Sequence, residues 1–356
     1  MVLNQASNVM LGSQEVQKVY LGTKLVWERK KACDATKINL ILLDENHQET
    51  SNIQYFDMLS AVAFYLKNTS DASNYALVIG EETELTATEP LMFQNCQNLI
   101  TVTFPNSMKL IAGNTFQNCT SLQSVVFPAG LMRIDGYAFS GCSQLAEIVL
   151  PENVSVGAGA FYECNSLQYI HIPEGMTMID TFTFSRCMSL TEVSISDGIT
   201  KIEAYAFSND ENLITVNIPD TVISIGNYAF AWCSHLTAIH IPAYVTKIPE
   251  NVFAACTSLT DVILPDNLTA IGAFAFEACT NLTEIIIPEC TETIGQRAFF
   301  ECAGLTEINI PSSVTSIGTS AFGRCTNLKK IVIHQAENSI SGVPWGADNA
   351  EIIWTE

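Results

Sequence analysis

Cysteine and histidine lie close together in the stretch AFAWCSHLTAIHIP, which covers residues 229 to 242. Cys233, His235 and His240 fall within eight positions, and short spacings between these two residue types are typical of zinc sites. A zinc site requires its ligands to converge on one point. A cysteine that recurs at a fixed period indicates a structural role instead, so the rest of the chain decides between the two.

A phenylalanine followed three residues later by a cysteine recurs along most of the chain. The ten pairs begin at Phe93, Phe116, Phe139, Phe161, Phe184, Phe230, Phe253, Phe276, Phe299 and Phe322. Phe207 keeps the phase with Asp210 in the place of the cysteine, and successive phenylalanines are 23 residues apart except for one step of 22. This self-similarity predicts a repeat solenoid in which each unit stacks on its neighbours.

Each copy approximates AFxxCxxLxxIxIPxxVxxIGxx, which predicts one strand per unit. In the copy that starts at Phe253, the segment TDVIL alternates between apolar and polar positions, and Pro265 ends it because proline cannot donate to a sheet ladder. One unit is too small to bury a core alone. We therefore expect about eleven strands in a parallel sheet, spaced by about 4.8 Å, with the cysteines inside as small apolar side chains.

The repeat answers the zinc question. Cys233 is one of ten regularly spaced cysteines and should point inward, whereas His240 lies between two core isoleucines and should point outward, so they cannot share a metal. Disulfides between turns are not expected, because stacking holds the Cβ atoms about 5 Å apart. Free thiols suit folding in a reducing cell. Cys33 and Cys290 lie outside the ladder and have no assigned role.

The repeat resembles the BspA-like, or Treponema pallidum-type, leucine-rich repeat over about residues 75 to 335. The resemblance implies a β-dominated, right-handed solenoid with a parallel sheet on its concave side, and it implies interaction rather than catalysis, as in bacterial surface adhesins. Asp210 departs from the pattern. Because a buried lone carboxylate is costly, we expect the turn to expose it or backbone amides to hold it, with a cation site at Asp210 and Glu211 as the alternative.

Residues 1 to 36 differ from the repeat and predict a small β attachment segment. Gly12 and Gly22 mark two turns, and β-prone runs at 16–21 and 25–27 flank the second. The stretch LGSQEVQKVYLGTKLVW resembles the N-terminal segment of structural proteins from gut bacteriophages and prophages, where LGxxxVxxVYLGxxLVW recurs. The resemblance implies that about the first 75 residues attach the chain to virion proteins.

Caps are predicted at both ends of the solenoid, which itself covers residues 93 to 335. In the N-terminal cap, 37 to 92, a strand at 37–43 is followed by a helix at 52–68, capped by Ser51 or Asn52, and by the first solenoid strand at 75–79. The buried helix face should hold Phe56, Leu59, Val62, Ala63 and Leu66. This α+β cap covers an edge that would otherwise template aggregation. In the C-terminal cap, 336 to 356, Trp345 and Trp354 should pack on the last turn.

Alternation along the predicted strands gives two outward-facing rows of side chains. The apolar row contains Thr103, Val126, Val149, His171, Ser194, Asn217, His240, Ile263, Ile286, Asn309 and Val332. The acidic row contains Thr101, Ser124, Glu147, Tyr169, Glu192, Thr215, Ala238, Asp261, Glu284, Glu307 and Lys330. This face could bind a protein or a glycan, and the candidate ligand residues are Tyr169, His171, His240, Glu192, Asp261, Glu284 and Glu307. The alternative is that β-branched residues simply favour strands.

Composition and motifs exclude several classes of function. The net charge of −21 argues against binding to nucleic acid and to anionic membrane surfaces. The chain has no signal-peptide pattern, and its longest apolar run, 58–66, reaches only about half of a membrane span. No nucleophile–base pair, phosphate loop or metal quartet emerges, so we expect no enzyme, no metal and no cofactor.

The sequence supports three hypotheses for function. The first is a phage or prophage virion protein, assembled in the bacterial cytoplasm, that uses the solenoid for host-surface recognition or decoration. The second is a BspA-like adhesin on the bacterial cell surface. In both, the partner is a protein or glycan on a host cell surface. The third is an intracellular protein-interaction scaffold.

Overall fold

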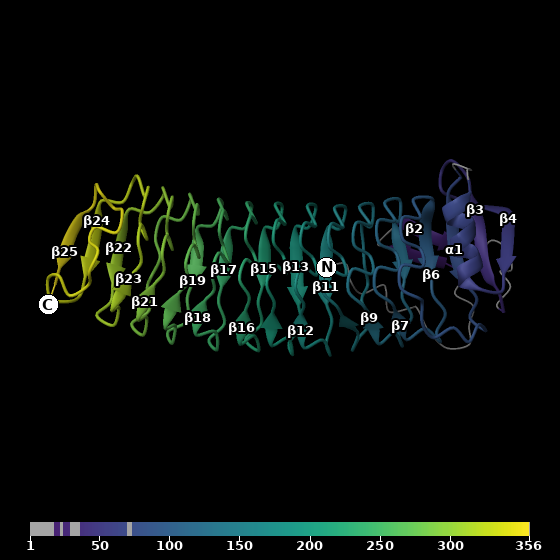
Figure 1. Ribbon diagram of the computed structural model, residues 1–356, viewed down its shortest axis with the longest axis horizontal. Helices are drawn as coiled ribbons and strands as arrows, with labels where there is room; N and C mark the ends of the chain where they lie inside the picture. Colours follow the sequence, from purple (N-terminus) through teal and green to yellow (C-terminus); the bar gives the residue numbers. More distant parts are fainter. Residues whose placement is uncertain (1–17, 22–23, 29–35, 70–72, 356) are drawn as a thin grey trace. The chain divides into compact units, whose positions relative to one another are not determined.

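The chain folds into two units, residues 1–167 and residues 168–356, in a computed structural model that describes residues 18–21, 24–28, 36–69 and 73–355. Both units are built mainly from parallel strands that follow one another turn after turn, which is the architecture of a parallel β-solenoid (Figure 1). The expected solenoid with a parallel sheet is confirmed. Among the described residues, no helix has the length and apolar character needed to cross a membrane.

The N-terminal unit holds a five-stranded sheet of order β4-β3-β5-β6-β8. Its strands are β3 (Ile38–Leu43), β4 (Glu49–Phe56), β5 (Tyr75–Ile79), β6 (Leu99–Thr103) and β8 (Ser124–Val126). Strands β5, β6 and β8 are parallel and belong to successive turns, whereas β3 is antiparallel to both β4 and β5. The β3–β4 pair therefore occupies the edge that the first solenoid strand would otherwise expose.

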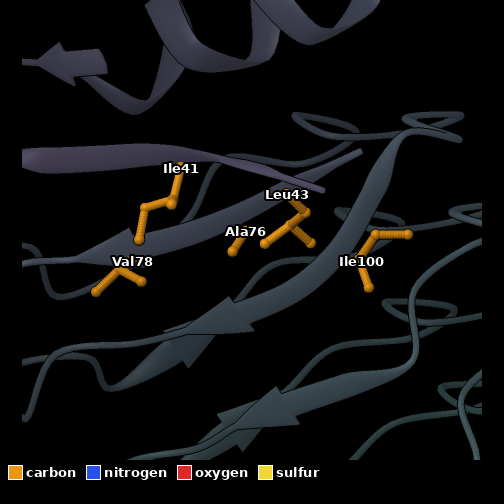
Figure 2. Close-up of a cluster of buried hydrophobic side chains, with 5 residues drawn as sticks. All are labelled: Ile41, Leu43, Ala76, Val78 and Ile100. Atoms are coloured by element: carbon orange, nitrogen blue, oxygen red, sulfur yellow. The ribbon is translucent and has the colours of Figure 1, made fainter. Parts of the chain in front are cut away.

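Apolar side chains tie this hairpin to the first turns. Ile41 and Leu43 of β3 pack with Ala76 and Val78 of β5 and with Ile100 of β6, and all five are buried (Figure 2). A separate antiparallel hairpin is formed by β1 (Lys18–Leu21) and β2 (Lys24–Glu28), where two β-prone runs were expected. The rest of the phage-like stretch, residues 11–17 and 22–23, lies outside the described residues.

The predicted cap helix is longer than the observed one, because the first part of the predicted range forms a strand. Helix α1 spans only Leu59–Asn68, and residues 49–56 form β4 instead. Ser51 and Asn52 thus lie inside a strand, and Met58 at the helix N-cap makes no side-chain capping bond. The reason is tertiary: β3 needs a partner on its free side, and Ile53, Tyr55 and Phe56 favour extended backbone. The expected apolar face is otherwise correct, since Leu59, Val62, Ala63 and Leu66 are buried and only Phe56 moves to the strand.

All turns of the repeat except the last, which starts at Phe322, contribute a two-residue strand. In the N-terminal unit, these are β7 (Leu110–Ile111), β9 (Arg133–Ile134) and β10 (Ser155–Val156), which pair in parallel. In the C-terminal unit, they are β12 (Met178–Ile179), β14 (Lys201–Ile202), β16 (Ser224–Ile225), β18 (Lys247–Ile248), β20 (Ala270–Ile271), β21 (Thr293–Ile294) and β23 (Ser316–Ile317). We call these stacks the short-strand sheets.

The longer strands of the C-terminal unit form three hydrogen-bonded sheets, β11-β13-β15, β17-β19 and β22-β24-β25, which we together call the long-strand sheet. Its strands are β11 (Tyr169–Ile172), β13 (Glu192–Ile195), β15 (Thr215–Asn217), β17 (Ala238–His240), β19 (Asp261–Ile263), β22 (Glu307–Ile310), β24 (Lys330–Ile333) and β25 (Glu351–Trp354). All their hydrogen-bonded pairs are parallel. Residues 284–287, between β19 and β22, are not assigned as a strand. Strand β25 adds the C-terminal residues to the last turn, with Trp354 beside Ile333, and Trp345 is buried, with its indole N–H donating to the Ser341 carbonyl at 2.8 Å.

The repeated phenylalanines form a buried ladder. Each of the eleven has no exposed surface, and consecutive rings within a unit stack nearly parallel, as for Phe276 and Phe299 at a centroid distance of 5.4 Å and an interplanar angle of 3°. Each ring therefore covers a face of the next and removes it from water. The period of the sequence and the period of the core are the same.

The cysteines connect one turn to the next through their thiols. Cys256 Sγ donates to the Phe230 carbonyl of the preceding turn at 3.2 Å, and the same oxygen accepts the Cys233 N–H at 3.3 Å. Eight ladder thiols make this bond, at 3.0 to 3.4 Å: Cys119, Cys142, Cys164, Cys233, Cys256, Cys279, Cys302 and Cys325. The eleven cysteines of the described residues are free thiols, and the ten of the ladder are buried as expected.

Two residues of each turn adopt left-handed backbone conformations, two positions before and two positions after the ladder phenylalanine. Around Phe230 these are Tyr228 with φ 60° and Trp232 with φ 62°. Bulky side chains rarely adopt this region. Stacking offsets the strain, because the Tyr228 ring lies 4.7 Å from that of Tyr205 one turn earlier and 5.9 Å from that of Trp232.

Asp210 occupies the cysteine position of its turn and is completely buried. Its Oδ1 accepts the backbone N–H of Cys187 at 2.8 Å, and its Oδ2 has no hydrogen-bond partner. The expectation that the turn would expose this carboxylate is wrong, because the ladder keeps its register, and the expectation that a backbone amide would hold it is confirmed. Burial raises the pKa of Asp210 well above its ordinary value, although the bond from Cys187 lowers it.

Thiol accessibility gives a direct test of the ladder. When the native protein is treated with iodoacetamide, we expect Cys290 to react and the ladder cysteines to stay protected, because Cys290 is exposed and burial raises the pKa of Cys256 to about 12. Peptide mapping by mass spectrometry before and after denaturation measures the labelling. Native labelling of Cys256 at a rate within about tenfold of that of Cys290 would contradict the buried ladder.

Replacing Asp210→Cys should stabilise the protein, and more so as the pH rises. An acid whose pKa is higher in the folded than in the unfolded chain contributes stability that is fully present below its unfolded pKa, near 3.8, and is lost as the pH rises through its folded pKa. The variant restores the thiol and has no such loss, so we expect a gain of about 1–3 kcal/mol at neutral pH.

Denaturant unfolding between pH 5.5 and pH 8, under reducing conditions, measures this gain for Asp210→Cys and for the exposed neighbour variant Glu211→Cys. The Glu211 variant should show no growing difference from the parent chain. A gain at position 210 that is independent of pH would show that the buried carboxyl is not the source of the effect.

Candidate functional site on the long-strand sheet

The strands of the long-strand sheet point alternate side chains into the core and outward. In β11, Ile170 and Ile172 are buried, whereas His171 is exposed and Tyr169 is half-buried. In β22, Ile308 and Ile310 are buried and Glu307 and Asn309 are exposed. The inward positions therefore belong to the apolar core, and the outward positions are free to vary in chemistry.

The strand register places the outward side chains in the two rows expected from the sequence. In the acidic row, Tyr169 pairs with Glu192 and Glu192 with Thr215, then Ala238 with Asp261, and Glu307 with Lys330. In the apolar row, the pairs are His171 with Ser194, Ser194 with Asn217, His240 with Ile263, and Asn309 with Val332. The alternation argument is thus confirmed for the placement of these residues.

The candidate ligand residues are spread along this face and do not converge. Tyr169, His171 and Glu192 lie on the neighbouring strands β11 and β13, and His240 and Asp261 lie on β17 and β19. Tyr169 and Glu307 are six turns apart, which corresponds to about 29 Å at the usual spacing of strands. Such an arrangement offers an extended contact surface rather than a reaction centre.

A shallow depression lies over β13, β15, β17 and β19. Its lining residues are Glu192, Val193, Ser194, Thr215, Val216, Asn217, Ala238, Ile239, His240, Asp261 and Ile263. The depression forms because Thr215 and Ala238 are short, whereas Glu192 and Asp261 on either side of them in the acidic row are longer. It also crosses the point where β15 and β17 belong to different hydrogen-bonded sheets.

Exposed isoleucines stand beside the acidic residues. The side chain of Ile263 is 51% exposed and that of Ile286 is 84% exposed, whereas Val332 in the same row is only 7% exposed. Neither isoleucine was among the candidate ligand residues. The sequence signal was present, since both belong to the apolar row, but their exposure depends on the size of neighbouring side chains and on what covers the last turns.

On the strands of the C-terminal unit, the acidic side chains lie mainly on the long strands, whereas two of the lysines lie on the short strands. The acidic row contains one lysine, Lys330, and its Nζ lies 3.1 Å from Glu307 Oε1. Exposed Lys201 and Lys247 belong to β14 and β18 of the short-strand sheet. The long-strand face therefore carries negative charge, and the lysines of this unit neutralise little of it.

The histidines near the face make ordinary structural contacts. His171 Nδ1 lies 3.3 Å from Ser194 Oγ. His235 Nδ1 lies 2.7 Å from the Glu211 carbonyl oxygen, and the same oxygen accepts a bond from Ser234 Oγ at 3.1 Å, so the adjacent serine and histidine are both engaged with the backbone of the preceding turn. Ser234 Oγ also lies 3.4 Å from His235 Nδ1, but this nitrogen donates its proton to the Glu211 carbonyl and is therefore not placed to act as a base toward the serine.

The structure does not bring Cys233 and His240 of the stretch at residues 229 to 242 together. Cys233 is buried and donates to the Phe207 carbonyl at 3.2 Å. His240 is exposed and points away from the core, which its neighbour Ile239 faces. Within the ranges that the structure describes, no three histidine, cysteine or acidic side chains gather as metal ligands do. At the alternative cation position, Asp210 is buried and Glu211 is exposed, so the two carboxylates lie in different environments.

Comparison with protein families gives a match over most of the chain. The model of the BspA type leucine rich repeat region matches residues 81–156, 154–262 and 246–343. No match is found among the curated proteins. The matched region contains every candidate ligand residue and both rows of the C-terminal unit.

Several solved structures are similar to this chain. A leucine-rich repeat protein from Bacteroides ovatus is 24% identical, with a TM-score of 0.44, and the match covers 81% of this chain and 97% of that one. A leucine rich cell surface protein from Faecalibacterium prausnitzii is 26% identical, with a TM-score of 0.46 and coverage of 76% and 93%. The pneumococcal vaccine antigen PcpA is 19% identical, with a TM-score of 0.43 and coverage of 78% and 74%.

The family match covers the part of the chain that carries the repeated phenylalanines and most of the parallel strands. Because the matched residues 81 to 343 make up well over half of the 356 residues, the assignment does not depend on a single motif. The chain belongs to the BspA-type leucine-rich repeat family.

Proposed function

We propose that this protein is a non-enzymatic binding protein of the adhesin type, which presents the long-strand face of its C-terminal unit to a macromolecule on a host cell surface. The observation that carries the proposal is the distribution of chemistry on that face. Exposed acidic, imidazole and isoleucine side chains are displayed turn after turn on a fixed backbone, in a pattern suited to contact with a large partner.

Two further points support binding over catalysis. The polar candidates are spread along the face from β11 to β22 rather than gathered around one point, as the groups of a reaction centre are. The ladder thiols, which are the most nucleophilic groups of the repeat when ionised, are buried, and burial raises their pKa.

The expected location is the bacterial cell surface. One of the similar solved structures is described as a leucine rich cell surface protein from Faecalibacterium prausnitzii. The hypothesis of a virion protein rests on the resemblance of residues 11 to 27, much of which lies outside the described residues, and it stays a prediction. Co-purification of the chain with phage particles would support it, and the intracellular scaffold is tested by a pull-down from the source cell.

A bulky side chain in the depression should abolish binding to the partner. We expect Thr215→Trp to weaken attachment of the labelled full-length protein to host cells, or to an immobilised protein or glycan, by about tenfold or more, because the indole fills the space between Glu192 and Asp261. Ser224→Trp is the matched control, since Ser224 is equally an exposed strand residue of the same turn but lies in the short-strand sheet.

Flow cytometry and surface-immobilised ligand panels provide the measurement, with circular dichroism to establish that both variants are folded. Equal loss of attachment by the two variants, or no attachment by the parent chain to any member of these panels, would overturn the proposal that the long-strand face binds a host-surface partner.

A further inference from the structure

The exposed isoleucines form an apolar strip that the protein leaves in water. Ile286 is 84% exposed, which is the largest exposed fraction among the large hydrophobic residues of the described chain, and Ile263 one turn earlier is 51% exposed. Both point outward from the same face, because residues 284 to 287 alternate between exposed and buried as the strands do. Adjacent exposed apolar side chains of this size are typical of a surface that contacts a partner.

Carboxylates run parallel to this strip. Asp261 precedes Ile263 by two residues and Glu284 precedes Ile286 by two, so each turn shows one acid and one isoleucine on the same face. Like charges at the same position of neighbouring turns repel each other. Glu307 is paired with Lys330, but Asp261 and Glu284 have no ion-pair partner among the described residues. A cationic partner would relieve this repulsion.

The spacing of the strip matches the pitch of an α-helix. Neighbouring turns of the solenoid are separated by about 4.8 Å, and one helical turn rises about 5.4 Å. Asp261 and Glu307 are two solenoid turns apart. The distance along these two turns is therefore only about 1 Å shorter than the rise of two helical turns. A helix laid along the stacked turns would present one residue to each rung on the acid side and another on the isoleucine side.

We infer that the strip of Asp261, Ile263, Glu284 and Ile286 docks a basic amphipathic helix of a partner protein. Lysine or arginine side chains at positions three or four apart face the two carboxylates, and leucine-like side chains beside them cover the isoleucines. The net charge of −21 steers such a helix toward the protein, and the placement of Lys201 and Lys247 on the other sheet leaves this face negative. The inference rests on the proposed function and names its partner class.

The probe is a 14-residue peptide of lysine and leucine in which the leucines recur with the helical period. Two comparison peptides have the same length: one with strict Lys-Leu alternation and one with glutamate in place of lysine. Fluorescence anisotropy with the full chain measures binding at about 50 mM and about 300 mM salt. We expect the helical basic peptide to bind, to weaken as salt rises, and to bind at least about tenfold more tightly than either comparison peptide.

Matched variants locate the peptide. Asp261→Lys with Glu284→Lys should weaken binding by about tenfold or more, whereas Glu250→Lys with Glu292→Lys, the same change of charge at exposed positions outside the long strands, should change it by less than about threefold. Ile286→Thr should also weaken binding by about tenfold, and Ile223→Thr should not, although Ile223 is 53% exposed.

Equal binding of the alternating or acidic peptide, or equal effects of the two lysine pairs, would overturn the inference. Its failure is distinguishable from failure of the proposed function. If a host-surface ligand binds the parent chain but not the Thr215→Trp variant, and the basic peptide does not bind, only the inference of a helix partner is refuted. If the basic peptide binds at the strip but no host-surface ligand is found, only the adhesin role is refuted.

Discussion

The fold depends on one constraint, which is that a turn of 23 residues cannot bury its own core. Each turn is stabilised only through the contacts it shares with its neighbours, and the shared elements are the ring of one phenylalanine on the next and the thiol that donates to the phenylalanine carbonyl one turn back. A cysteine suits this position because it fills the volume of a small apolar side chain and still offers a weak donor. A larger or strongly polar side chain would not satisfy both demands.

The same constraint separates the interior from the surface. Because the ring recurs in all eleven copies and the thiol in ten of them, the backbone of each turn must repeat, and the outward strand positions are left to carry different chemistry at a fixed spacing. Asp210 shows how strongly the interior resists change. One buried carboxylate, with a single backbone bond, is accepted in the ladder rather than being expelled, since expelling it would disrupt the stacking of Phe207 with Phe184 and Phe230. The left-handed residues, such as Tyr228 and Trp232, are a further local strain that stacking offsets.

The sequence alone predicts the features that depend on its period and little beyond them. The ladder, the parallel strands and the two outward rows could be derived because each depends only on spacing and alternation. The first half of the cap helix could not, because residues 49–56 become a strand through pairing with β3, a contact that no local pattern encodes. The fate of Asp210 depends on the rigidity of neighbouring turns. The difference between exposed Ile286 and covered Val332 depends on the C-terminal residues, which place Ile353 of β25 beside Val332.

The central claim is that turns are interchangeable units held by their neighbours, and an in-phase deletion tests it most directly. Removing residues 254 to 276 joins Phe253 to Glu277 and takes away one whole copy while keeping the next cysteine three residues after a phenylalanine. The account predicts a folded protein with parent-like circular dichroism and protected thiols, whereas deletion of residues 254 to 265, about half a copy, should expose the ladder cysteines to alkylation. If the whole-copy deletion unfolds the C-terminal unit as completely as the half-copy deletion does, the account is contradicted.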